Sequence, residues 1–119
     1  QGSLWEFLSS LDEKLQRKLL RQIFLLSQVH LCDLKEPHFK HFVLEKYKML
    51  YELRERNKVL VRIIFTIQDG DIILLAPFIK RQPRDTMKAL ELSLRMLADI
   101  REHPEFAVNF IPKKEEHSA

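Results

Sequence analysis

The sequence predicts an α+β fold in which helices flank an antiparallel sheet, and three observations carry this prediction. Up to about residue 29, apolar side chains recur at the three- and four-residue spacing of an amphipathic helix. Residues 49–78 alternate instead with a period of two, and an Asp-Gly pair typical of hairpin turns interrupts them. Helical spacing returns between residues 85 and 101. Helices before and after a group of strands are typical of α+β domains.

The length and composition indicate one globular domain. A chain of 119 residues can bury a single core but not two, so we assign residues 1–119 to one domain, with 104–119 as a tail that can be flexible. No apolar run approaches the roughly 20 residues of a membrane span, and no signal peptide opens the sequence. The one cysteine, Cys32, cannot form an internal disulfide. We therefore expect a cytoplasmic protein that does not associate with membranes.

The basic charge is concentrated in one part of the chain. The net charge is +3 and the pI is about 9.1. Residues 44–88 contain ten lysines and arginines against six acidic residues, an excess larger than that of the whole chain. Such a balance fits a nucleic acid or an acidic protein as partner but does not require one.

Two helices are expected at the N-terminal end. Residues 4–11 form a short helical turn, and Asp12 is a suitable N-cap for a longer helix that extends to Val29. Pro37 then disfavours helix at the residue before it. The apolar face of the longer helix consists of Leu15, Leu19, Leu20, Ile23, Phe24 and Leu26.

The middle of the sequence predicts a three-stranded antiparallel meander. Strands are expected at residues 49–54, 59–68 and 72–78, joined by turns at Asn57-Lys58 and Asp69-Gly70. The Asp-Gly pair suits a type I′ turn, which needs positive φ at both central residues. We expect the helices to pack together on one face of this sheet.

Alternation assigns the side chains of these strands to opposite faces. In the first strand, Tyr51 and Leu53 share one face, and Glu52 and Arg54 share the other. In the second strand, Arg62 falls on the face of Leu60, Ile64 and Thr66.

A last helix is expected after the third strand. Pro83 lies in the connecting loop, and Asp85 or Thr86 can cap a helix that continues to about Arg101. Pro104 ends it. Its apolar stripe consists of Met87, Leu90, Leu94, Leu97 and Ala98.

Three segments together resemble a known protein family. Residues 37–42 are Pro-His-Phe-Lys-His-Phe, residues 50–54 are Leu-Tyr-Glu-Leu-Arg, and residues 78–81 are Phe-Ile-Lys-Arg, with Arg62 on the strand between the last two. HigB-like members of the RelE/ParE superfamily show a similar P-x-x-K-x-L segment, a YELR strand, an arginine in the next strand and an F-x-K-K segment after the third. The likeness covers residues 3–103 and implies a RelE-like fold.

The resemblance also implies a function. Proteins of this kind are the toxins of bacterial type II toxin–antitoxin pairs and cut translated mRNA at the ribosome without a metal or another cofactor. An antitoxin, typically with a helix-turn-helix DNA-binding module, holds them inactive. We therefore expect a metal-independent endoribonuclease whose partners are mRNA, the ribosome and a cognate antitoxin.

Cations on neighbouring strands are the candidate catalytic residues. Arg54 and Arg62 would clamp the phosphate and the transition state, because the guanidinium fork matches phosphate oxygens. Lys80 is the better candidate for proton transfer, since lysine gives up its proton more readily than arginine. The sequence contains no cluster of metal ligands and no cofactor fingerprint. The candidates for RNA binding are Lys40, His41, Arg81 and Arg84.

The same residues allow other interpretations. Glu52 and Arg54 can form a structural ion pair, and Arg62 can be a structural arginine among apolar neighbours. The histidine that often ends the third strand in this family is absent, and Ala76 and Pro77 stand in that region. Its absence favours a ParE-like toxin that inhibits DNA gyrase by protein contact. A regulatory binding domain without catalysis is the third hypothesis.

Overall fold

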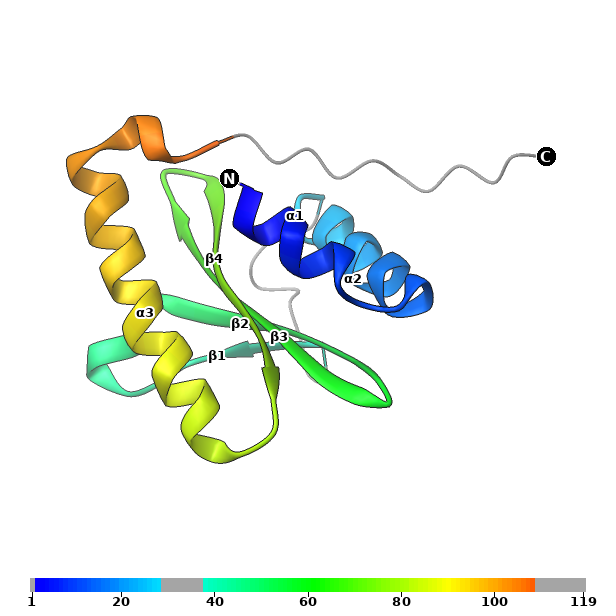
Figure 1. Cartoon of the computed structure of the whole chain (residues 1–119). Helices are drawn as coiled ribbons and strands as arrows, with labels where there is room; N and C mark the ends of the chain where they lie inside the picture. The colour runs from blue at the N-terminus through cyan, green and yellow to red at the C-terminus, as the bar shows by residue number, and fades with distance from the viewer. Residues whose placement is uncertain (1, 29–37, 109–119) are drawn as a thin grey trace.

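The computed structural model describes residues 2–28 and 38–108 of the chain. Helices come first and last, with a sheet between them, so the predicted α+β class is confirmed (Figure 1). The predicted helix end at Val29, the breaker Pro37, Cys32 and the tail beyond residue 108 lie outside the described residues. The α-helices of the described residues are α1 (Gly2–Ser9), α2 (Glu13–Leu26) and α3 (Pro83–Glu102).

The sheet has four antiparallel strands in the order β1-β2-β3-β4. The last three form the predicted meander, and the first is an additional strand that the sequence did not reveal. Three residues are too few for an alternating pattern to be seen, and pairing with the next strand is what makes them a strand. The strands are β1 (Phe39–His41), β2 (Leu50–Asn57), β3 (Val59–Gln68) and β4 (Asp71–Lys80).

Both predicted turns are present. Lys58, between β2 and β3, has a φ of 69°. Asp69 and Gly70, between β3 and β4, have φ of 51° and 82°, so both central residues have the positive φ that a type I′ turn requires. These turns set the register, which pairs Arg54 with Arg62 across β2 and β3.

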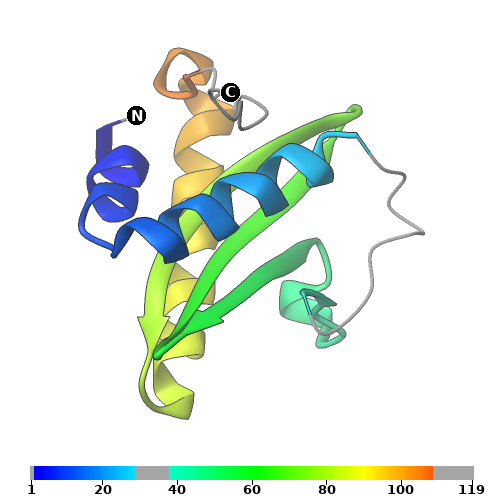
Figure 2. The same ribbon diagram turned by 90° about the vertical axis from the view of Figure 1, so that its right-hand side faces the viewer.

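The helices cover opposite faces of the sheet, so the expectation that they pack on one face was wrong. Figure 2 shows α2 in front of the strands and α3 behind them. The reason lies in β3, whose Val61, Ile63 and Phe65 point to one core cluster while Ile64 points to another. A strand that is apolar on both faces needs a cover on each, and this signal was present in the sequence.

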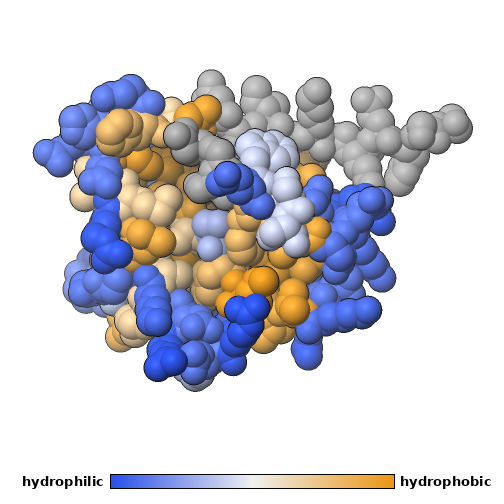
Figure 3. All heavy atoms as spheres, in the orientation of Figure 1, coloured by the Kyte–Doolittle hydropathy of each residue, from blue (hydrophilic) through white to orange (hydrophobic). Residues whose placement is uncertain are grey.

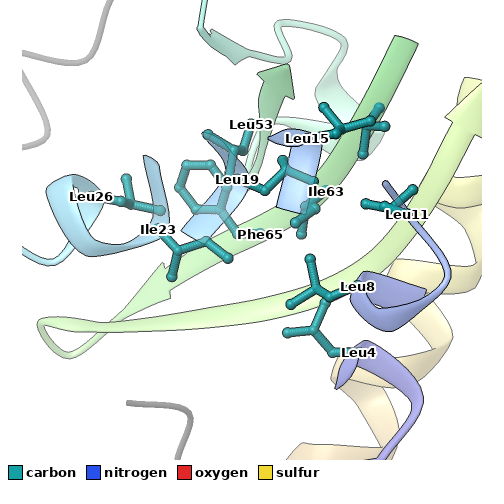
Figure 4. Packing of buried hydrophobic residues seen from close by; sticks show 11 residues of the cluster. Leu4, Leu8, Leu11, Leu15, Leu19, Ile23, Leu26, Leu53, Ile63 and Phe65 are labelled. Carbon is teal, nitrogen blue, oxygen red and sulfur yellow. The ribbon is translucent and has the colours of Figure 1, made fainter. Parts of the chain in front are cut away.

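The first core cluster lies between the sheet and the two N-terminal helices. Asp12 caps α2 as predicted, because its side chain accepts a hydrogen bond from the Leu15 backbone N–H at 2.9 Å. The cap sets the phase of the helix, whose buried side chains then meet Leu53, Ile63 and Phe65 (Figure 4). The helical side chains of this cluster are Leu4, Leu8, Leu11, Leu15, Leu19, Ile23 and Leu26.

The second core cluster lies between the other face and α3. The apolar stripe of α3 is rotated from the predicted one, because Met87 is 46 % exposed and Ala98 is exposed too. Ala89 and Ser93 are buried instead, and their small side chains allow the helix to approach the sheet closely. The sheet side of the cluster includes Leu50, Ile64, Leu75 and Ala76, and the helix side includes Ala89 and Leu90.

The start of α3 also differs from the prediction. Its N-cap is Gln82 rather than Asp85 or Thr86, and Pro83 is the first helical residue rather than part of a loop. Proline suits this position because its missing N–H would have no helical partner there. Asp85 completes a capping box by accepting a hydrogen bond from the Gln82 backbone N–H at 3.0 Å.

Candidate active site

The register of the sheet places the predicted cations on one face. Arg54 lies opposite Arg62, and Lys80 lies opposite Leu60, the residue that shares the face of Arg62. Lys40 of β1 lies opposite Glu52 and therefore on this face as well. We call Lys40, Arg54, Arg62 and Lys80 the basic face; it is the face of the sheet that α3 covers.

Glu52 lies buried at the centre of the basic face, with 2 % of its surface exposed. Its Oε1 accepts a hydrogen bond from Arg54 Nε at 2.9 Å and forms an ion pair with Arg62 Nε at 3.5 Å. The side chains of Arg54 and Arg62 are 23 % and 11 % exposed. One carboxylate oxygen therefore binds two guanidinium groups from adjacent strands.

The electrostatics of this cluster are governed first by the burial of Arg62. Burial lowers the pKa of the Arg62 guanidinium, an effect that Glu52 opposes and Arg54 strengthens. The guanidinium nevertheless stays protonated at any ordinary pH, as arginines do in proteins. Arg54 and Arg62 are thus two partly buried guanidinium groups that share one buried carboxylate oxygen.

Some polar atoms of this region have no hydrogen-bond partner among the described residues. They include Glu52 Oε2, Arg62 Nε and Thr86 Oγ1. The 3.5 Å between Arg62 Nε and Glu52 Oε1 is an ion-pair distance that is long for a hydrogen bond. Such unsatisfied groups each cost about 1–3 kcal/mol and are few in native structures.

Arg81 and Arg84 lie at the N-terminus of α3, directly after Lys80, and both are exposed. The backbone N–H of Arg81 donates to Asp85 Oδ2 at 2.8 Å. That hydrogen bond, with one from the Gln82 N–H, lowers the pKa of the Asp85 carboxyl. When the side-chain amide of Gln82 is oriented with its oxygen toward Arg84, that oxygen accepts hydrogen bonds from Arg84 Nε at 2.9 Å and from Arg84 Nη2 at 3.1 Å. The two arginines thus extend the positive charge beyond the end of β4.

His41 is the predicted RNA-binding residue that the fold does not bring to the basic face. It lies opposite Tyr51 on the α2 side of the sheet and stacks on that ring, with 4.3 Å between the centroids. Its Nε2 is 2.6 Å from the Lys48 carbonyl oxygen. The stack continues to Phe65 at 5.3 Å. His41 therefore extends an aromatic row of the first core cluster.

The sequence did not reveal how central Glu52 is to this arrangement. Its place between Tyr51 and Leu53 showed the face it occupies, but its burial depends on α3, which covers that face. Arg56 was also missed: it lies opposite Leu60 and so shares the face of Arg54 and Lys80. The signal for Arg56 was available, because it is two residues from Arg54 on one strand.

Two further findings concern the described residues alone. No group of three or more His, Cys, Asp or Glu side chains there is arranged to hold a metal ion. No helix in the described part of the chain is long and apolar enough to cross a membrane.

Comparison with known proteins identifies the family to which the chain belongs. Residues 6–98 match the model of the family described as Phage derived protein Gp49-like (DUF891). Searches among curated proteins and among solved structures returned no match. The match spans most of the chain, from α1 to the last turns of α3, and includes every residue of the basic face. The chain therefore belongs to the phage-derived Gp49-like family, which is part of the RelE/HigB-like toxin superfamily.

Proposed function

We propose that this protein is the HigB-like toxin of a type II toxin–antitoxin pair and a metal-independent endoribonuclease that cuts translated mRNA at the ribosome. Membership of the Gp49-like family supports the assignment as a toxin of a toxin–antitoxin pair. The observation that carries the nuclease proposal is the pair of arginines on one buried carboxylate, Glu52. A preorganised pair of guanidinium groups is suited to a phosphate whose charge grows during reaction.

The proposed reaction uses the 2′-hydroxyl of the RNA itself. Its oxygen bonds to the adjacent phosphorus, the bond from phosphorus to O5′ breaks, and a 2′,3′-cyclic phosphate and a 5′-hydroxyl result. The 2′-hydroxyl proton passes to solvent, and the Lys80 ammonium donates a proton to the leaving O5′. Arg54 and Arg62 stabilise the extra negative charge on the phosphoryl oxygens.

The surroundings of the basic face suit an RNA strand. Arg81 and Arg84 continue its positive charge past Lys80, and Lys40 adds to it from β1. Contacts to phosphates bind RNA in a salt-dependent way without reading its sequence. His41 remains a candidate only for a contact on the other side of β1. In this proposal the antitoxin covers the basic face, and the protein acts in the cytoplasm.

The test is expression of this protein alone in bacteria, followed by primer extension on a translated message. We expect growth arrest with new 5′ ends inside the message, and we expect Arg62→Ala or Lys80→Ala to relieve the arrest. Losing one preorganised donor costs about 100-fold or more in rate, which is enough to abolish toxicity. Arg17→Ala is the matched control, because Arg17 lies on α2 and pairs with Glu13. Growth arrest with intact mRNA would end the nuclease proposal.

A ParE-like toxin is the second candidate, and one observation favours it. The middle of β4 carries Ala76 and Pro77, whereas related nucleases often have a histidine in this region, and Ala76 is buried. A toxin that inhibits gyrase by protein contact needs no acid or base. It would arrest growth with stalled replication and uncut mRNA. A domain that neither cuts mRNA nor slows growth would instead be a regulatory one.

A further inference from the structure

We propose that Glu52 is a positioning residue that holds Arg54 and Arg62 in the geometry needed to bind the reacting phosphate. The inference deepens the proposed nuclease function and rests on it. The role differs from that of a base, because Glu52 is 2 % exposed and its Oε1 already binds both guanidinium groups.

The two arginines need such a residue because they face each other. Arg54 and Arg62 are directly paired across β2 and β3, and like charges in that position repel. Glu52 lies one step along on the same face, two residues before Arg54 and diagonal to Arg62. A single carboxylate at this point attracts both cations and offsets their repulsion.

The atoms used in these contacts also orient the guanidinium groups. Both arginines meet Glu52 through Nε, the nitrogen nearest the side-chain stem. A guanidinium held by Nε directs its Nη atoms away from the stem, and the Nη atoms are the outer part of the fork that phosphate binds. Glu52 therefore contacts the inner edge of both guanidinium groups, through a hydrogen bond from Arg54 and an ion pair with Arg62. Arg62 Nη1 donates to the Val61 carbonyl oxygen at 3.5 Å. In this proposal the Nη atoms recognise the phosphate.

The arrangement is poor for stability alone. Glu52 Oε2 has no hydrogen-bond partner among the described residues, although the residue is buried. Burying an ion pair is often no better than burying apolar side chains of the same size. A carboxylate kept here at a cost in stability is more readily explained by what it does to the two arginines.

The first experiment measures the environment of the two arginine side chains by NMR. Two-dimensional ¹H–¹⁵N NMR of the whole protein should show slowly exchanging Nε–H signals for Arg54 and Arg62 that move and exchange faster in Glu52→Gln. The matched control is Glu55→Gln, because Glu55 lies on the same strand, is 9 % exposed and pairs with Lys18 on the α2 side. If Glu52→Gln leaves both Nε–H signals as they are in the wild type, the positioning role is wrong, whatever the protein does to RNA.

The second experiment measures cleavage of an mRNA in a translating extract. Glu52→Gln should lower kcat by about 100-fold, as expected for misplaced reacting groups, with a smaller effect on KM, while Glu55→Gln changes neither. The pH profile should keep its shape, whereas loss of a general base would remove its acidic limb. In an Arg54→Ala background the loss caused by Glu52→Gln should shrink, because Glu52 acts through that arginine. If Glu52→Gln acted only through the general structure of the protein, its loss of kcat would be the same in the Arg54→Ala background as in the wild type.

The two experiments separate the failure of this inference from that of the proposed function. A wild-type protein without cleavage, but with Nε–H signals that depend on Glu52, would end the nuclease proposal and leave Glu52 as the residue that orders the arginines. A wild type that cleaves, with Glu52→Gln as active as Glu55→Gln, would overturn the positioning role. Should Glu52→Gln not fold, Glu52→Asp keeps the charge with a shorter reach and is expected to lose kcat in the same direction.

Discussion

Arg62 carries a positive charge into the sheet, with 11 % of its side chain exposed. Its neighbours explain why it is stable there: Glu52 attracts it, and the apolar stem of the side chain lies beside Phe78 on the adjacent strand. Burial lowers the pKa of its guanidinium because it disfavours the charged form. An anion nearby would favour the charged form and so offset this cost of burial. A residue held in this way contributes to both the fold and the site.

Arg62→Ala should therefore lower stability as well as activity. The substitution removes one of the two arginines that contact the buried Glu52 carboxylate and leaves only Arg54. We therefore expect the free energy of unfolding to fall by about 1–3 kcal/mol. Urea unfolding followed by circular dichroism measures this difference. Arg17→Ala, on the exposed side of α2, is expected to stay within about 0.5 kcal/mol of the wild type. Equal stability of Arg62→Ala and wild type would show that the Glu52 ion pair with Arg62 contributes nothing to folding.

Sequence reasoning found the members of the candidate site but not their relations. Alternation along β2 and β3 is enough to put Arg54 and Arg62 on one face. Lys80 joins them only because the register of β3 and β4 shifts between Ile63 and Phe65, and the Asp-Gly turn alone would place Lys80 on the opposite face. The burial of Glu52 could not be predicted, because it depends on which elements cover its face, and the expectation of helices on one face did not say which face they would cover. His41 was misplaced for a related reason: the strand that orients it is too short to be recognised.

At the scale of elements, a polar cluster joins α3 to the short 3₁₀ turn η2 (Glu45–Tyr47) that precedes β2. Glu91 of α3 accepts a short hydrogen bond from the Tyr47 hydroxyl and an ion pair from Lys46 Nζ at 2.8 Å. The ion pair with Lys46, and then the hydrogen bond from Tyr47, lowers the pKa of Glu91. The hydrogen bond to Glu91 raises the pKa of Tyr47 and of Lys46.

These shifts predict loss of stability at both ends of the pH scale. Glu91 contributes above its ordinary pKa of 4.5, and its contribution is lost as the pH falls below that value. Tyr47 and Lys46 contribute below their ordinary pKa values of 10.0 and 10.5, and this is lost as the pH rises past them. Thermal unfolding from pH 3 to 11 should show Tm falling less steeply at both ends in Glu91→Gln than in the wild type. Parallel curves for the two proteins would contradict this assignment.

The turn between β3 and β4 gives a second prediction at this scale. Gly70 has a φ of 82°, and a Cβ placed there would meet no atom within 4 Å. The cost of Gly70→Ala is therefore that of the backbone conformation alone, about 1–2 kcal/mol. Gly70→Asn should cost less, since asparagine visits this conformation more readily. Unfolding free energies of the two variants test the order, which would be reversed if side-chain packing decided it.

The elements themselves were largely predictable, and the exceptions have physical reasons. β3 begins and ends where the alternation places it, and α2 starts at its predicted cap, Asp12. The start of α3 was misjudged because Pro83 suits a loop and a first helical turn equally well. The predicted layer order was wrong because it assumed one apolar face, whereas β3 and β4 are apolar on both.

At the scale of the molecule, β4 is the outer strand of the sheet. Among the described residues, no strand pairs with its outer side. Figure 3 has the orientation of Figure 1, in which β4 faces the viewer. Hydrophobic residues gather near the middle of this view, and hydrophilic residues surround them. An apolar outer strand with unpaired backbone groups is a site at which a further strand can add.

This edge predicts that the 119-residue chain associates as its concentration rises. Ile72→Lys places a charge on β4 at a side chain that also packs against the first core cluster. In a variant that circular dichroism shows to be folded like the wild type, it should shift sedimentation velocity profiles toward the monomer at high concentration. Val43→Lys is the control, because Val43 is 87 % exposed but lies between β1 and η2. If Val43→Lys reduces association and Ile72→Lys does not, the contact surface lies away from β4.

The meander also has a consequence for how the chain folds. Each strand pairs with its neighbour in the sequence, so each pairing closes a short loop and loses little chain entropy. All strands are complete once residue 80 has been synthesised, together with α1 and α2, which cover the first face. The second face, with Glu52 and its arginines, stays uncovered until the twenty residues of α3 have followed. On a nascent chain, the face that carries Glu52 and its arginines therefore remains exposed to water and to other molecules after α1 and α2 have covered the first face.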